Sequence, residues 1–207
     1  MPKYDFSDQE TMLRSYRGTK IYMASHPEIR KHLRNRERPT EFGDKIWDMT
    51  FRLMTYLEQE SGPLNHILDV VCGWGLLGIH LARLNQAKVT CIDTDSKLEP
   101  IVLKHAALND VAIAFKAARF QEISESDLEV DLLIGSEICY CEALRIELSQ
   151  LADRAAHANT KRMLIADPGR PDFDDLYEYC RSRHSAKLID IRLPEETKPT
   201  YLMSIRF

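Results

Sequence analysis

The sequence lacks any long apolar run. Although 44% of its 207 residues are hydrophobic, no stretch approaches the roughly 18 consecutive apolar residues that a membrane-spanning helix needs. The first eight residues are polar and acidic and lack the apolar core of a secretory signal. These absences argue against a membrane protein and against a secreted one, and they predict a soluble protein of the cytoplasm.

Excess positive charge is lacking as well. The 28 lysines and arginines are outnumbered by 32 aspartates and glutamates, which leaves a formal net charge of −4. Proteins that hold a nucleic-acid backbone do so through clustered basic residues that displace counterions. A dedicated duplex-binding protein is therefore disfavoured, and we expect no nucleic-acid partner.

Cysteines with the spacing of metal ligands are also missing. The five cysteines are an odd number, and Cys139 and Cys141 have neither a second pair nor a histidine pair nearby. A zinc site needs such a second set of ligands, so we predict no metal. Reduced thiols are expected, as in a cytosol-like compartment.

After residue 40 the sequence alternates between short apolar runs and helical segments. The apolar residues from Asp44 to Glu60 recur three to five residues apart, which predicts an amphipathic helix that ends at a Ser-Gly-Pro sequence. Further helices are predicted over 76–84, 96–109 and 142–157. Apolar runs typical of buried strands occupy 67–71, 89–92, 112–117, 130–135 and 162–166.

The last part of the chain breaks this alternation. The strand-like runs Ala186–Leu193 and Tyr201–Phe207 have no helix between them, which predicts an antiparallel hairpin. Alternating strands and helices require crossover connections. We therefore predict a Rossmann-like α/β fold: a doubly wound, mostly parallel sheet of seven strands with a carboxy-terminal antiparallel hairpin. Residues 1–40 are predicted to be a helical or irregular extension of a domain over 41–207, with a short exposed helix at 28–38.

A glycine-rich turn follows the first predicted strand. Gly73, Gly75 and Gly78 form a G-x-G-x-x-G pattern, in which glycines permit a tight turn and bring a ligand close to the backbone. The pattern fits a nicotinamide dinucleotide as well as a nucleoside cofactor. Asp69, at the end of the strand, favours the nucleoside cofactor. Its carboxylate would repel a pyrophosphate in the crevice but would suit the cationic amino acid end of S-adenosylmethionine.

Asp93 ends the second predicted strand, about twenty residues after the loop. Its carboxylate can accept hydrogen bonds from ribose hydroxyls with either cofactor, so Asp93 does not discriminate between them. For both Asp69 and Asp93 the alternative is a carboxylate that only stabilises a turn or caps a helix.

Four segments resemble the class I, seven-strand methyltransferases. More narrowly, they resemble the protein-lysine methyltransferase branch, which includes the enzyme that acts on the electron transfer flavoprotein β-subunit. The segments are Phe42–Trp47, Asp69–Gly75, Asp131–Tyr140 and Ile165–Pro171. The likeness extends from about residue 42 to 174. It implies S-adenosylmethionine as the cofactor and a protein lysine as the methyl acceptor.

The resemblance, together with the loop, gives a set of expected site residues. Trp47 takes by position the place of a tryptophan that packs near the cofactor in this family, the alternative being a core aromatic residue. Glu137 and Tyr140 are expected to be catalytic, with Glu137 positioning the acceptor amine. The alternative for Glu137 is a solvated loop carboxylate. The expected cofactor-binding residues are Trp47, Asp69, Gly73, Trp74, Gly75, Asp93 and Ser136.

The chain departs from the family pattern in three places. Val71 replaces the first glycine and brings a branched side chain toward the cofactor. Glu137 replaces an aspartate, and Ala118-Arg119-Phe120 replaces an acidic residue followed by tryptophan. Two alternatives therefore stay open: a non-catalytic binding protein with this fold, and a nicotinamide-dependent oxidoreductase. Asp167 and Arg170 could shape the acceptor entrance or only form a turn.

Overall fold

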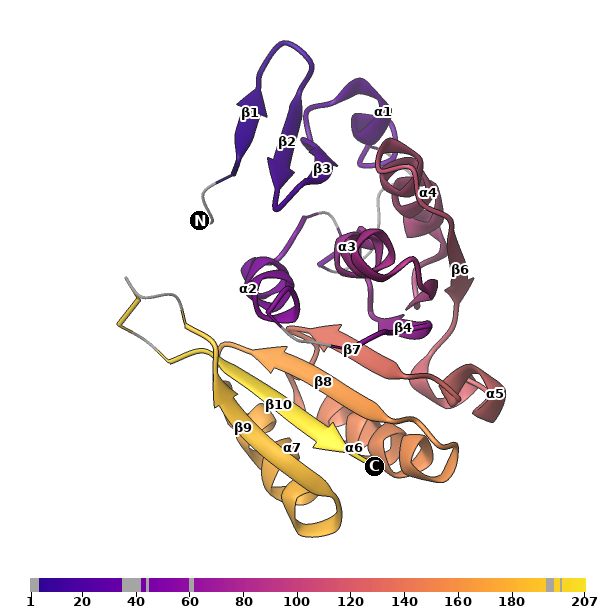
Figure 1. Cartoon of the computed structure of the whole chain (residues 1–207), viewed down its shortest axis with the longest axis vertical. Coiled ribbons are helices and arrows are strands. Elements are labelled where there is room, and N and C mark those ends of the chain that lie inside the picture. Colours follow the sequence, from indigo (N-terminus) through magenta and orange to yellow (C-terminus); the bar gives the residue numbers. More distant parts are fainter. Residues whose placement is uncertain (1–3, 35–41, 44, 60–61, 193–195, 198) are drawn as a thin grey trace.

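A computed structural model describes residues 4–34, 42–43, 45–59, 62–192, 196–197 and 199–207. Its main body is a seven-stranded sheet in the order β6-β5-β4-β7-β8-β10-β9 (Figure 1). The strands are β4 (His66–Val70), β5 (Lys88–Asp93), β6 (Ile113–Ala117), β7 (Leu132–Ser136), β8 (Arg162–Asp167), β9 (Ser185–Asp190) and β10 (Tyr201–Arg206). Only β10 pairs antiparallel to its neighbours in this sheet. The predicted α/β fold with its carboxy-terminal hairpin is thereby confirmed.

Helices cover both faces of this sheet (Figure 1). One face carries α2 (Asp48–Leu57), α3 (Leu76–Asn85) and α4 (Glu99–Leu108), and the other carries α5 (Glu125–Leu128), α6 (Glu142–His157) and α7 (Pro171–Arg183). Successive side chains along a strand pack against opposite helix layers: Ile67 packs in the cluster with α2 and α3, and Leu68 packs in the cluster with α6 and α7. Strands buried on both faces need such continuous apolar runs. Among the described residues, no helix has both the length and the apolarity to cross a membrane.

Several details differ from the sequence-based expectations, among them α5, which was not predicted. The helix expected over 96–109 begins with a 3-10 turn, η2 (Ser96–Leu98), before α4. A second 3-10 turn, η3 (Phe120–Glu122), follows β6. Helix α7 was not predicted, because Phe173, Leu176 and Cys180 are its only fully buried residues in a segment rich in charge. The helix predicted over Asp44–Glu60 is shorter in the structure, where α2 covers Asp48–Leu57 and the preceding Trp47 is extended with φ of −93° and ψ of 146°. Asp44 and Glu60 themselves lie outside the described residues.

The prediction of a helical or irregular extension over residues 1–40 was wrong for its first half. The structure has a three-stranded antiparallel sheet there, with β1 (Phe6–Asp8), β2 (Leu13–Tyr16) and β3 (Thr19–Tyr22). The predicted helix at 28–38 is reduced to α1 (Pro27–Arg30), and residues 35–38 lie outside the described part. The β2–β3 hairpin was not predicted from the sequence because its strands are short. Its turn, Arg17-Gly18 with φ of 48° and 70°, also lacks the usual Asn or Asp.

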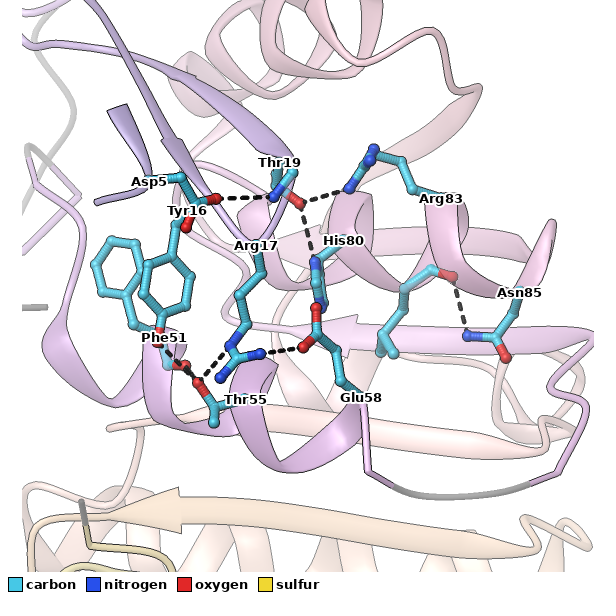
Figure 2. A network of polar contacts seen from close by, with 12 residues as sticks. Asp5, Tyr16, Arg17, Thr19, Phe51, Thr55, Glu58, His80, Arg83 and Asn85 are labelled. Carbon is cyan, nitrogen blue, oxygen red and sulfur yellow. Dashed lines mark hydrogen bonds and ion pairs between the residues drawn. The ribbon is translucent and has the colours of Figure 1, made fainter. Parts of the chain in front are cut away.

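A polar network attaches the β2–β3 hairpin to the helical layer (Figure 2). Arg17 donates a hydrogen bond from Nε to Thr55 Oγ1 of α2 at 3.0 Å and forms an ion pair with Glu58. Thr19 Oγ1 lies 2.9 Å from Nδ1 of His80 in α3, and both residues are fully buried. Burial lowers the pKa of His80 to about 4, so its ring is neutral at pH 7. The hairpin is thus part of the same packed body as the large sheet.

Candidate functional site

A cavity of about 350 Å³, here called the main cavity, opens at the carboxyl edge of the sheet. Doubly wound sheets bind ligands at this edge, where the strand order reverses. Its lining residues are Phe42, Gly43, Trp47, Val71, Gly73, Asp93, Thr94, Asp95, Leu98, Ser136, Glu137, Ile138, Tyr140 and Arg170. A second cavity of about 230 Å³, the side cavity, shares part of this wall and extends past the end of β6 to α6.

The glycine loop has an open side and a closed side. Gly73 lines the main cavity with φ of 54°, and a Cβ placed there would meet nothing within 4 Å. Gly75 caps the start of α3 with φ of 73°, and a Cβ there would lie 2.8 Å from Cγ1 of Val102. A ligand can therefore approach the backbone at Gly73, whereas Gly75 is required for packing and lines neither cavity.

Asp69 lies beneath the loop rather than in the crevice. Its side chain is 2% exposed and accepts a hydrogen bond from the Gly78 backbone N–H at 2.9 Å. Burial raises the pKa of Asp69 to about 7, against the lowering effect of that hydrogen bond. Asp69 shares one face of β4 with Ile67, because side chains alternate along a strand. The expectation that Asp69 points into the crevice is therefore corrected: it supports the loop through the first turn of α3.

Asp93 occupies the junction of the two cavities. It ends β5 and lines both of them. Its carboxylate accepts hydrogen bonds from the backbone N–H groups of Gly73 at 3.1 Å and Asp95 at 3.2 Å. Burial raises the pKa of Asp93. Asp93 thus holds the loop and at the same time presents an acceptor to the cavities.

The two tryptophans have different surroundings. Trp47 precedes α2 and lines the main cavity. Its indole N–H donates a hydrogen bond to the Phe42 carbonyl at 3.1 Å, and the Lys45 ammonium lies 3.6 Å from the centre of its ring. Trp74 is only 4% exposed and donates its indole N–H to the Gly43 carbonyl at 3.1 Å. The structure brings Trp47 to the main cavity and places Trp74 in the core, outside both cavities.

Glu137 joins three elements at the end of β7. Its backbone has φ of 59°, which is rare for a residue with a side chain. Oε1 accepts the Met49 N–H of the first turn of α2 at 3.1 Å, and Oε2 accepts Nη2 of Arg170 at 3.0 Å. Arg170 also donates from Nη1 to Asp167 of β8 at 2.8 Å. Both oxygens of Glu137 are thus engaged, and its catalytic role stays a prediction.

An aromatic wall flanks the main cavity. The Phe42 ring lies 5.6 Å from that of Trp47 and 5.3 Å from that of Tyr140, which is 43% exposed. Ser136 completes the strand end, with its Oγ 3.5 Å from Thr50 Oγ1. Tyr140 and Ser136 both line the main cavity, and their roles in catalysis and cofactor binding stay predictions.

Several lining residues were not selected from the sequence. Thr94 and Asp95 directly follow β5, and Ile138 lies two residues after β7. The rule that ligands bind at the carboxyl ends of strands could have found these three. Leu98 and Phe42 carry no such signal, because they approach the cavity from connecting segments.

Val71 lies in a strained conformation between the loop and both cavities. Its φ is 54° and its side chain is 37% exposed. For a β-branched residue this conformation costs on the order of 1–3 kcal/mol.

We expect Val71→Gly to raise the free energy of unfolding by about 1 kcal/mol, because relief of strain exceeds the added chain entropy of glycine. Urea denaturation measures this, and Val71→Ala, which keeps Cβ, should gain less. Unchanged or reduced stability of Val71→Gly would argue against strain.

Comparison with known proteins places this geometry in a family. The sequence signature described as lysine methyltransferase matches residues 28–177. The electron transfer flavoprotein beta subunit lysine methyltransferase of Danio rerio is 31% identical over 133 residues, covering 64% of this chain and 50% of that protein. The ribosomal protein L11 methyltransferase of Thermotoga maritima is 21% identical over 155 residues, covering 75% and 56%. The chain thus spans about half the length of the curated relatives it matches.

Solved structures share the fold. The ribosomal protein L11 methylase of Lactobacillus delbrueckii subsp. bulgaricus gives a TM-score of 0.60 at 17% identity, covering 78% of this chain and 80% of that one. TrmK of M. capricolum, in complex with S-adenosyl-homocysteine, gives 0.57 at 17% identity, covering 75% and 67%. The signature spans the glycine loop, most of the sheet and the residues that line both cavities. The chain therefore belongs to the lysine methyltransferase family.

Proposed function

We propose that the protein is an S-adenosylmethionine-dependent methyltransferase. The observation that carries this proposal is the main cavity, where a glycine loop open at Gly73 meets the Asp93 carboxylate. Its ionisable wall includes Asp93, Asp95, Glu137 and a single arginine, Arg170, so negative charge predominates. Such a wall suits a cationic sulfonium and opposes the pyrophosphate of a nicotinamide dinucleotide.

The residues present fit this cofactor. Asp93 would accept hydrogen bonds from the ribose hydroxyls, and the open space beside the Gly73 backbone would admit the amino acid end. The bound cofactor would supply a methyl group on a positively charged sulfur. Trp47, Phe42 and Tyr140 would then shape the path by which the acceptor reaches that methyl group, and orientation of this kind supplies much of the rate.

We further propose that the acceptor is a protein lysine. The family description and the Danio rerio relative both specify lysine, and the Thermotoga relative is named for another protein acceptor. The aromatic wall and the negative charge suit a long aliphatic side chain that ends in an ammonium group. A lysine with a solution pKa near 10.4 must lose a proton before transfer. Glu137 and Tyr140 are the residues we assign to holding the amine.

Ligand binding tests the cofactor assignment. We expect isothermal titration calorimetry to show micromolar binding of S-adenosylmethionine and S-adenosylhomocysteine and no binding of NADH. Asp93→Ala should weaken the binding of S-adenosylmethionine and of S-adenosylhomocysteine by about 10- to 100-fold, because hydrogen bonds to a charged acceptor contribute about 1.5–3 kcal/mol. Asp93→Asn keeps an acceptor for the Gly73 N–H and should fall between. Binding of NADH alone would favour an oxidoreductase, and no binding of any ligand would favour a non-catalytic relative.

Methyl transfer tests the acceptor. Purified protein is incubated with isotopically labelled S-adenosylmethionine and either the electron transfer flavoprotein β-subunit or ribosomal protein L11, and mass spectrometry locates the label. Label on a lysine side chain of either protein supports the proposal. Label only on an α-amine or another side chain would contradict the lysine assignment and leave the cofactor assignment intact.

A further inference from the structure

The side cavity lies next to Asp93 and is lined in part by apolar side chains. It begins at Asp93, where the proposed function places the ribose, and its walls include the apolar residues Ile92, Phe120, Ile138 and Leu144. The main cavity extends in the other direction, to the glycine loop and the acceptor wall. A base attached to a ribose at Asp93 therefore belongs in the side cavity, between apolar walls.

The chain segment after β6 has few groups that could form hydrogen bonds with that base. The Ala118 N–H donates to the Asp93 carbonyl at 2.9 Å, and the Arg119 N–H donates to Glu122 Oε2 at 2.7 Å. The side chains of 118–120 are Ala, Arg and Phe, none of which can accept a hydrogen bond from an exocyclic amino group. Recognition of such an amino group by a side chain must therefore come from another element.

Besides Asp93, Glu147 of α6 is the carboxylate among the residues that line the side cavity. It lies one turn after Leu144, and both residues line the cavity. The Glu147 carboxylate forms no hydrogen bond or ion pair with any part of the chain that the structure describes, and the residue is half-buried. An ionised carboxylate is acceptor-only, so it would pair with an amino group and would repel a carbonyl oxygen at the same position.

We propose that Glu147 is the specificity-determining residue for the cofactor's base, accepting a hydrogen bond from the adenine amino group. This inference rests on the proposed function. It assigns the side-chain recognition of the amino group to α6, because residues 118–120 have no side chain that can accept a hydrogen bond. Arg119, the cation in the same wall, has donors only and suits the ring nitrogens of the base.

Two ligands that differ at a single group test this assignment. S-adenosylhomocysteine carries the amino group, and S-inosylhomocysteine has a carbonyl oxygen in its place. By calorimetry the unmodified protein should bind the adenosyl ligand at least tenfold more tightly. Glu147→Gln presents both a donor and an acceptor, and the preference should fall to about twofold or less. Glu142→Gln, an exposed residue of the same helix outside both cavities, should keep the tenfold preference.

The outcomes separate this inference from the proposed function. If the unmodified protein binds neither ligand, the cofactor assignment fails. If it binds S-adenosylhomocysteine but shows no preference, or if Glu147→Gln retains the full preference, Glu147 does not read the base while the cofactor assignment stands. Thermal unfolding of each variant is measured alongside, so that a change in preference is compared only between folded proteins.

Discussion

Arg170→Met is expected to lower the free energy of unfolding by several kcal/mol and to weaken cofactor binding at the same time. Arg170 is the cation between Glu137 and Asp167, and the Asp167 side chain is fully buried. Removing one partner from such a cluster leaves uncompensated buried charge, which costs about 3–5 kcal/mol. The binding defect follows because Glu137 also holds the first turn of α2, next to Trp47.

Urea denaturation at pH 7 and calorimetry measure the two effects. Arg170→Lys should give an intermediate loss, because one ammonium cannot reproduce the two parallel donors of a guanidinium. Arg145→Met is the matched control: its ion pair with exposed Glu142 lies at 3.4 Å on the surface, so its loss should be small. The interpretation would be abandoned if Arg170→Met were no more destabilising than Arg145→Met.

Asp69→Asn is expected to stabilise the protein increasingly as the pH rises from 4 to 8. The pKa of Asp69 is about 7 in the folded state against 3.8 for an exposed aspartate. Below pH 3.8 both states are protonated and burial carries no charge penalty. Above pH 7 both are ionised, and the difference of 7 − 3.8 = 3.2 corresponds to a penalty on the order of 4 kcal/mol. Asparagine cannot ionise and keeps an oxygen for the Gly78 N–H.

Urea denaturation of both proteins at intervals across this pH range gives the difference in stability directly. Asp131→Asn is the control with the opposite sign. Its hydrogen bonds to Lys161 and to the backbone lower the pKa of Asp131 to about 2, so its stabilising effect is present above pH 3.8 and is lost as the pH falls toward 2. A difference between Asp69→Asn and the unmodified protein that did not vary with pH would refute the burial argument.

The large sheet could be predicted because its strands are buried on both faces. Strands such as His66–Val70 and Leu132–Ser136 are buried along almost their whole length, and the glycines between strand and helix mark the ligand edge. Residues 6–22 could not be predicted in the same way. Their strands of three and four residues are too short to show a period, and they are stabilised by tertiary contacts with α2 and α3.

The candidate site was predictable by position but not by orientation. Asp93 and Trp47 line the main cavity as expected, whereas Trp74, next to Gly73 in the loop, turns into the core. The position of Asp69 follows from its alternation with Ile67, a step that a motif alone does not include. The pairing of Arg170 with Glu137 joins residues 33 apart in the chain. Only the completed sheet brings these two together.

The place of β10 in the sheet bears on how the protein is synthesised. β10 lies between β8 and β9 in the sheet. Because β10 follows β9 in the sequence, β9 can join the sheet only after β10 has left the ribosome. Until residues 201–206 emerge, β8 presents an unpaired backbone edge carrying the apolar sequence Met163–Ala166. Such an edge is a template for pairing with other chains. A nascent chain stalled before this strand would therefore expose an aggregation-prone edge.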